Sequence, residues 1–240
     1  GSPVVFNAGN TADIGIAYDS SNNKVVIAYR DKNNSDYGTA IVGTVSGTSI
    51  SFGTASIFLS ALTEYTQAVY DSSNNKVVLS YRGTSGYGLS VVGTVSGTSI
   101  TFTSPSVFQT FQPGVVKSVY DATAQQTFIA YQDYSASYIG VAQAVSISGT
   151  TATFSGKTTL VNANPSPFNL GYDPDNGKSV FVFNETTGQA LVTSFGDLPL
   201  TTGTKYYVTT SGTFSSSADT PSVNAGLAIS TTSLLLNGDS

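Results

Sequence analysis

Short runs of alternating apolar and polar residues, separated by turn-forming residues, make up most of this 240-residue chain. In the first repeat of this pattern the runs cover residues 14–18, 24–30, 38–45 and 49–52. Ser-Ser-Asn-Asn and Ser-Gly-Thr segments separate the first pair and the last pair of runs. Alternation with a period of two is typical of β-strands, and Ser, Asn and Gly are common in tight turns. The pattern therefore predicts four short antiparallel strands, of which the last continues through residues 55–58.

The same pattern returns along the chain as internal repeats. Residues 18–26 return unchanged as 70–78, and residues 42–50 return as 92–100. The dipeptide Tyr-Asp begins at positions 18, 70, 120 and 172, so two further copies are present in a drifted form. Four antiparallel strands in each repeat of roughly 50 residues are typical of a β-propeller blade. We therefore predict an all-β fold, a β-propeller of five four-stranded blades whose last blade is closed by the N-terminal strand.

The two ends of the chain are the reason for predicting this closure. Residues 228–237 align with residues 44–53, which places the C-terminus inside a degenerate repeat. Residues 3–6 match residues 55–58 and 105–108, which end outer strands. A ring closed in this way hides the two open edges that would otherwise invite aggregation.

The domain organisation follows from the repeats. We expect residues 3–203 to form four repeats and residues 204–240 to form a degenerate fifth blade. The alternative is that residues 204–240 form a small separate C-terminal β unit. Residues 1–2 look like the remnant of a removed tag, and a chain without Met is expected to be a fragment of a longer protein.

The composition of the chain excludes most enzyme chemistries. Only 10% of the residues are charged, and the chain contains no His, Cys, Met or Trp. A Ser-His-Asp triad, a Cys-His dyad and a His-containing metal site are therefore impossible, and we predict no cofactor. The net charge of −5 without a basic cluster argues against nucleic acid as a partner. No apolar run approaches the ~20 residues of a membrane span, so membrane insertion is not expected.

A comparison of the repeats separates constant turns from variable loops. In a propeller, the loops between strands two and three and the loops between blades lie on one face, and here those loops differ from copy to copy. Variable loops on a constant scaffold are the usual construction of a binding surface. Tyr and Arg both suit the recognition of a sugar, through an aromatic ring and a planar set of donors. The predicted ligand-binding residues on this face are Arg30, Tyr37, Tyr65, Arg82, Tyr87, Tyr134 and Tyr138.

Structural roles are the alternative for several of the recurring residues. Tyr29, Tyr81 and Tyr131 each end a second strand and are expected to pack in the core or between blades. The Asp that follows each repeated Tyr is expected to accept backbone N–H bonds in the turn after it. No metal site is predicted. A calcium loop through Asp173 and Asp175 is the alternative in the fourth copy, although it lacks a closing acidic ligand.

The repeats also resemble those of a known family. The form Ala-Tyr-Asp-Ser-x-Asn-Asn-Lys-Val-Val-Ile-Ala-Tyr-Arg, followed by Val-Gly-Thr-Val-Ser-Gly-Thr-Ser-Ile-Ser-Phe, is similar to repeats in tail-fibre-like proteins of bacteriophages, especially from aquatic metagenomes. Residues 205–208 and 221–236 resemble a short unit that often ends such proteins. The resemblance implies an extracellular location in the tail fibre of a virion. It also implies a bacterial cell-surface glycan or another surface receptor as partner, and other fibre proteins of the virion.

From these observations we predict a non-enzymatic module that recognises a host surface glycan through the variable loops. One alternative is a structural or protein-docking propeller of a viral fibre. Another is a glycoside hydrolase or lyase, which would use two acidic groups that flank the scissile bond. Asp13 and Glu64, in corresponding inter-blade loops, are the first pair to consider for such an enzyme. Other acidic residues in loops of the same face are Asp31, Asp36, Asp133 and Glu185.

Overall fold

The computed structural model describes residues 1–184 and 187–193, together with four short strands closer to the C-terminus. The chain divides into two units, Gly1–Phe195 and Gly196–Ser240. No helix in the described residues is long and apolar enough to cross a membrane. The described strands of the second unit form an antiparallel sheet and are β18 (Lys205–Val208), β19 (Phe214–Ser215), β20 (Val223–Ala228) and β21 (Leu234–Leu235).

The first repeat folds into the strands that its sequence pattern predicts. They are β1 (Thr11–Asp19), β2 (Lys24–Asp31), β3 (Tyr37–Ser46) and β4 (Ser49–Phe52). These strands pair antiparallel in chain order. The turns contain a left-handed residue, Asn23 with φ 51° and Gly47 with φ 58°, as tight turns between strands require. The predicted all-β fold is confirmed.

A single long strand, β5 (Ser56–Asp71), joins the first sheet to the second. Its beginning pairs with the start of β3, as far as Leu62 opposite Tyr37. From Thr63 onward it pairs instead with β6 (Lys76–Gly83). The outer edge of the first repeat therefore consists of β4 and the start of β5, which agrees with the predicted continuation through residues 55–58.

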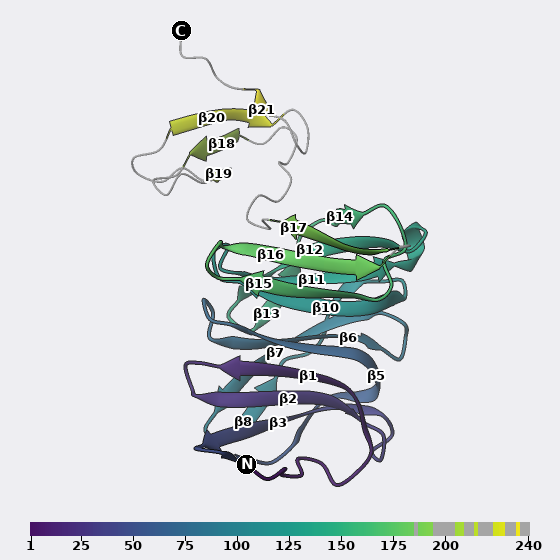
Figure 1. Cartoon of the computed structure of the whole chain (residues 1–240), viewed down its shortest axis with the longest axis vertical. Coiled ribbons are helices and arrows are strands. Elements are labelled where there is room, and N and C mark those ends of the chain that lie inside the picture. The colour runs from purple at the N-terminus through teal and green to yellow at the C-terminus, as the bar shows by residue number, and fades with distance from the viewer. Residues whose placement is uncertain (185–186, 194–204, 209–213, 216–222, 229–233, 236–240) are drawn as a thin grey trace. The chain divides into compact units, whose positions relative to one another are not determined.

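The later repeats follow the same plan, and successive sheets of the first unit lie face against face (Figure 1). The second repeat is completed by β7 (Gly88–Ser96), β8 (Ser99–Phe102) and β9 (Ser106–Gln109). The third contains β10 (Pro113–Asp121), β11 (Gln126–Asp133), β12 (Ile139–Ser148), β13 (Thr151–Phe154) and β14 (Thr158–Val161). The described strands of the fourth are β15 (Phe168–Asp173), β16 (Lys178–Asn184) and β17 (Gly188–Thr193).

The core lies between neighbouring sheets, and an aromatic pair recurs in it. The Phe58 ring lies 5.1 Å from the Tyr81 ring, and the Phe108 ring lies 5.3 Å from the Tyr131 ring. Tyr81 and Tyr131 are completely buried, so packing between sheets is confirmed as their role. Each Phe comes from the outer edge of one sheet and contacts the next sheet, which holds successive repeats together by apolar burial.

Phe6 makes the same contact at the start of the chain. Its ring lies 5.2 Å from that of Tyr29, which is 1% exposed and is the counterpart of Tyr81 in the first repeat. Residues 3–6 form no strand, so the predicted N-terminal strand is not observed as a strand. The side chain of Phe6 nevertheless occupies the position that an outer strand supplies in the later repeats.

The first sheet has one exposed apolar face. Ile14 and Ile16 on β1 are 54% and 65% exposed. Their counterparts on β5 are Thr66 and Ala68, which are 1% and 8% exposed because the first sheet covers them. The face of β1 that carries Ile14 and Ile16 is therefore exposed, whereas the equivalent face of β5 in the next repeat is buried.

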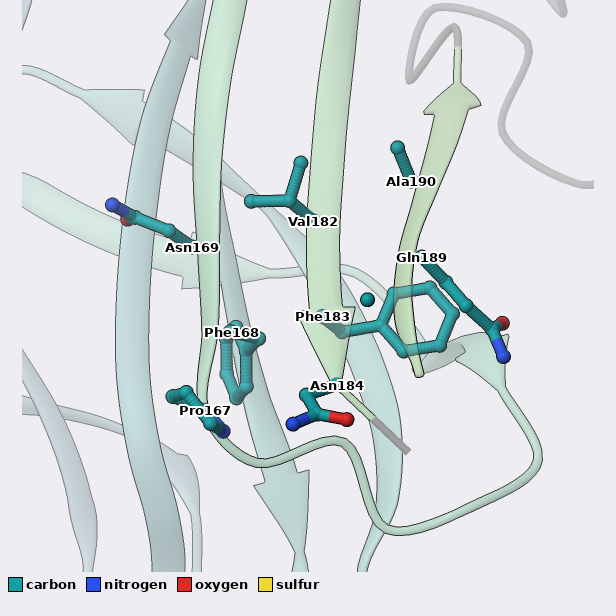
Figure 2. A pocket seen from close by; sticks show the side chains of 9 residues that line it. Pro167, Phe168, Asn169, Val182, Phe183, Asn184, Gln189 and Ala190 are labelled. Carbon is teal, nitrogen blue, oxygen red and sulfur yellow. The ribbon is translucent and has the colours of Figure 1, made fainter. Parts of the chain in front are cut away.

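The fourth sheet has an exposed face as well. A shallow hollow of about 610 Å³ lies over it. Figure 2 shows Asn169, Val182 and Ala190, which are paired across β15, β16 and β17 and line this hollow. The counterparts of Val182 and Ala190 in the first repeat are Ala28 and Ala40, which are buried against the second sheet. The hollow is therefore an open sheet face and not an enclosed ligand site.

Candidate functional site

The innermost strands of three successive repeats begin with an irregularity at the same place. β1 packs against β5, and β5 packs against β10. The strand register shifts between Ala12 and Gly15 in β1, and equivalent shifts occur between Glu64 and Gln67 in β5 and between Gly114 and Val116 in β10. At these bulges the backbone is left-handed, with φ values of 47° at Asp13, 55° at Tyr65 and 25° at Val115. Bulges redirect side chains and often lie beside functional sites, and positive φ values at residues other than glycine store strain there.

The first bulge carries an ion pair. Arg30 Nη2 lies 3.1 Å from Asp13 Oδ2, and Arg30 Nε lies 3.7 Å from Asp36 Oδ1. Arg30 comes from the end of β2, whereas Asp36 comes from the loop that leads into β3. The arginine therefore brings together one acidic group from the inner strand and one from the variable loop.

The second bulge carries a tighter arrangement. Glu64 Oε2 accepts hydrogen bonds from Arg82 Nη2 at 2.7 Å and from Arg82 Nε at 3.0 Å. The same guanidinium group lies 4.7 Å from the centre of the Tyr65 ring and donates to the Pro113 carbonyl at 3.3 Å. Charge-assisted bonds and a cation–π contact together fix the position of the Glu64 carboxylate.

The two acidic residues do not occupy the same position in their repeats. Glu64 lies opposite Arg82 in the strand ladder, whereas Ala12 lies opposite Arg30. Asp13 is thus the counterpart of Tyr65, one residue further along. Both repeats therefore pair an acidic group with an arginine. The acidic residue lies directly opposite the arginine in the second repeat and one residue further along in the first.

The third repeat has no acidic residue at its bulge. Gly114 is the counterpart of Glu64, and Gln132 is the counterpart of Arg82. A Cβ atom on Gly114 would overlap with the Tyr134 ring and with Gln132 Oε1. The Tyr134 ring lies 4.5 Å from the Tyr138 ring in an edge-to-face contact. Aromatic residues therefore occupy the region where the first two repeats place charge.

A further ion pair, which the sequence did not reveal, holds the loop of the third repeat. Asp133 is 2% exposed and accepts hydrogen bonds from Lys157 Nζ at 2.6 Å and from Gln109 Nε2 at 2.8 Å. It also accepts a bond from Ser135 N at 3.0 Å. Burial alone would raise the pKa of Asp133, but the bonds from Lys157 and Ser135 and the Lys157 charge hold this pKa below its ordinary value.

The other predicted ligand-binding tyrosines lie at the starts of third strands. Tyr37 begins β3 opposite Asp31, and Tyr87 precedes β7 and is 41% exposed. In the third repeat Ile139, and not Tyr138, lies opposite Asp133. Tyr138 is therefore one residue earlier than the position that Tyr37 and Tyr87 occupy. Glu185 lies outside the residues that the structure describes.

On the opposite face, the repeated Asp residues form turn hydrogen bonds. Asp19 Oδ1 accepts from Asn22 N at 3.0 Å, and Asp71 Oδ1 accepts from Asn74 N at 3.0 Å. The Asp173 carboxylate accepts hydrogen bonds from Asn176 and Asp175 within the same turn, and these bonds lower the pKa of Asp173. The described part of the chain contains no group of three or more His, Cys, Asp or Glu side chains that could hold a metal ion.

The constant turns of this face also bind one another across the repeats. Ser21 Oγ donates to Asn75 Oδ1 at 2.7 Å, and Ser73 Oγ donates to the Gln125 carbonyl at 3.1 Å. Each of these bonds joins one repeat to the next. Hydrogen bonding between repeats therefore accounts for the constancy of these turns.

Comparison with known proteins gives a structural match. No protein-family model and no curated protein sequence matches the chain. The chain is similar to an exo-β-1,3-galactanase from Phanerochaete chrysosporium, solved as a Glu-to-Gln variant with β-1,3-galactotriose. The TM-score is 0.51 at 13% sequence identity, over 92% of this chain and 51% of the galactanase. The same galactanase with galactose matches over 77% of this chain and 47% of its own length, with a TM-score of 0.49 and 11% identity.

This likeness supports the β-propeller class of fold. The chain spans about half the length of the galactanase that it matches. Nothing in these comparisons concerns tail fibres, so the resemblance to phage proteins, the virion location and the surface partners stay predictions.

The comparison corrects the functional prediction. The predicted non-enzymatic recognition module, and the prediction that the chain is not an enzyme, are contradicted by the likeness to a glycoside hydrolase, which favours the hydrolase alternative. The physical reason is that variable loops on a constant scaffold serve catalysis as well as binding. The absence of His and Cys carries no weight against a reaction that needs only carboxylates.

Proposed function

We propose that this chain is the propeller of a carboxylate-dependent glycoside hydrolase that acts on a neutral polysaccharide. The observation that carries the proposal is the pair of acidic residues, Asp13 and Glu64, at equivalent bulges of the successive strands β1 and β5. The likeness to a β-1,3-galactanase supports the reaction class, and β-1,3-linked galactan is the first substrate to test. Two carboxyl groups on opposite sides of a glycosidic bond are sufficient for its hydrolysis.

The contacts of the two acidic groups suit different roles. Glu64 accepts two hydrogen bonds from one guanidinium group, so its carboxylate is positioned to act as base or nucleophile and to stabilise positive charge on the sugar. Among the described residues, Asp13 forms an ion pair with Arg30 alone, through Nη2. In this proposal Asp13, in its protonated form, donates a proton to the leaving oxygen as the C–O bond breaks. Glu64 takes a proton from water, and the oxygen of that water replaces the leaving oxygen on the sugar.

Isosteric variants test the proposal. Asp13→Asn and Glu64→Gln should each lower the rate of reducing-sugar release from the best substrate by about 100-fold or more, because each removes an acid–base or charged group from the reaction. Asp31→Asn is the matched control, since it makes the same change of charge on the same face and its side-chain oxygen can still accept the bond from Asn33 N. Unchanged rates in Asp13→Asn and Glu64→Gln, with folding intact, would remove these residues from the reaction.

We also propose that the ring has five blades, with residues 204–240 as the fifth blade and Phe6 in the place of an outer-strand residue of that blade. Three features of the first unit support this proposal. Ile14 and Ile16 leave one face of the first sheet exposed, Val182 and Val192 leave one face of the fourth sheet exposed, and Phe6 occupies the place of an outer-strand residue. A further blade between these two faces would bury both.

A further inference from the structure

The bulge of the third repeat differs from the first two in a way that creates an aromatic surface. The Tyr134 ring covers Gly114, and any larger residue at position 114 would displace it. Tyr138 packs edge-on against Tyr134 and is 47% exposed. Tyr138 therefore packs against Tyr134 on one side and is open to solvent on the other.

The loop that carries these tyrosines is held in place by the buried Asp133. Asp133 binds Ser135 through its side chain, and its carbonyl accepts a hydrogen bond from Tyr138 N at 2.9 Å. Ser137 and Tyr138 adopt left-handed conformations, with φ values of 58° and 67°. The hydrogen bonds of Asp133 hold the loop in this strained conformation before any ligand arrives, which lowers the entropic cost of binding.

This surface is connected by contacts to Glu64, one of the two proposed catalytic residues. Arg82, which binds Glu64, also donates to the Pro113 carbonyl. Pro113 is joined directly to Gly114, on which Tyr134 packs. A continuous set of contacts therefore leads from the Glu64 carboxylate to the tyrosine pair, without a change of face.

We infer that Tyr134 and Tyr138 form a subsite for one pyranose ring of a neutral oligosaccharide whose scissile bond lies at Asp13 and Glu64; this inference rests on the proposed function. An exposed aromatic ring offers an apolar face to the C–H groups of a sugar, and the tyrosine hydroxyl can bond to sugar hydroxyls. The two cations of this contact network are both paired with carboxylates, Arg82 with Glu64 and Lys157 with Asp133. The subsite therefore favours a neutral sugar over an anionic one.

Affinity gel electrophoresis with soluble β-1,3-galactan, β-1,3-glucan and xylan, which are all neutral polymers of pyranose rings, tests the subsite. The wild-type chain should be retarded by at least one of these polysaccharides, and Tyr138→Ala should raise the corresponding dissociation constant about tenfold, the loss expected for one aromatic contact. Tyr18→Ala is the matched control, because Tyr18 is also exposed but lies on the opposite face beside Asn23. This control should bind within about twofold of the wild type.

The subsite and the proposed function can fail separately. Weaker binding by Tyr138→Ala, without hydrolysis of any polysaccharide by the wild type, would uphold the subsite and overturn the hydrolase. Hydrolysis by the wild type, with the same binding and KM in Tyr138→Ala, would overturn the subsite and uphold the hydrolase. If the wild type binds none of the three polysaccharides, the subsite is also overturned.

Discussion

At the scale of single residues, two tyrosines at equivalent positions of successive repeats differ in their hydrogen-bond partners. Tyr81 and Tyr131 are both fully buried at the ends of second strands, and burial raises the pKa of both hydroxyl groups. Tyr131 donates to Gln143 Oε1 at 2.7 Å. The Tyr81 hydroxyl is buried and has no hydrogen-bond partner among the described residues.

The two tyrosines therefore predict opposite effects of the same substitution. Tyr81→Phe should leave the free energy of unfolding unchanged or raise it by up to about 1 kcal/mol, because it removes an unpaired polar group. Tyr131→Phe should lower it by about 1–3 kcal/mol, because it leaves the Gln143 oxygen without its donor. Urea unfolding of the two variants measures the difference, and equal effects would contradict the assigned hydrogen bonds.

Residue roles could be predicted from the sequence where they depend on local contacts. The turn hydrogen bonds of Asp19 and Asp71 follow from residues two or three positions away, so the repeated Tyr-Asp motif was enough to predict them. The partners of Arg30 and Arg82 were not predictable. They depend on a bulge that shifts the register by one residue, and no sequence pattern marks which side of the bulge carries the acid.

At the scale of strands and loops, one buried acidic group joins several elements. Asp133 ends β11, Gln109 ends β9, and Lys157 lies between β13 and β14. Their hydrogen bonds fix the outer end of the second sheet to the loops of the third. Residues 134–136 form a short 3-10 turn capped by Asp133, which period-two alternation could not predict.

This network predicts a specific pH dependence. The folded-state pKa of Asp133 is lowered, so its contribution to stability is complete above the unfolded value of about 3.9 and is lost as the pH falls through the folded value. Asp133→Asn should lower the free energy of unfolding at pH 7 by about 1–3 kcal/mol. The difference in free energy of unfolding between Asp133→Asn and the wild type should shrink as the pH falls from 5 to about 3. Urea unfolding at each pH measures this difference. A constant difference over this range would contradict the assigned role.

At the scale of the whole molecule, the repeats predicted the class of fold correctly because each repeat is one unit that must bury its faces against a neighbour. The order of the strands and their approximate limits followed from alternation and turn residues. The function was predicted wrongly, because loop diversity at Tyr37 or Tyr87 does not distinguish a binding surface from a catalytic one. The decisive contacts, such as Glu64 with Arg82, appear only when separate strands meet.

The proposed fifth blade predicts the cost of a charge on the exposed face of β1. Ile16→Asp should lower the free energy of unfolding by about 2 kcal/mol or more if a further blade covers this face, because a charge would be buried without a partner. Val107→Asp is the matched control, since Val107 and its counterpart Ile57 are both exposed, at 44% and 48%. Thermal unfolding compares the two, and an equally small effect of both would contradict the closed ring.

The reaction that we propose for this chain is the hydrolysis of a glycosidic bond by two carboxylic acid side chains. The most direct measurement is the release of reducing sugars from β-1,3-galactan and a panel of other neutral polysaccharides by the purified wild-type chain, with Glu64→Gln as the reference. We predict release by the wild type from at least one polysaccharide, at a rate at least about 100-fold above that of Glu64→Gln. No release from any polysaccharide, or equal release by Glu64→Gln, would contradict the account.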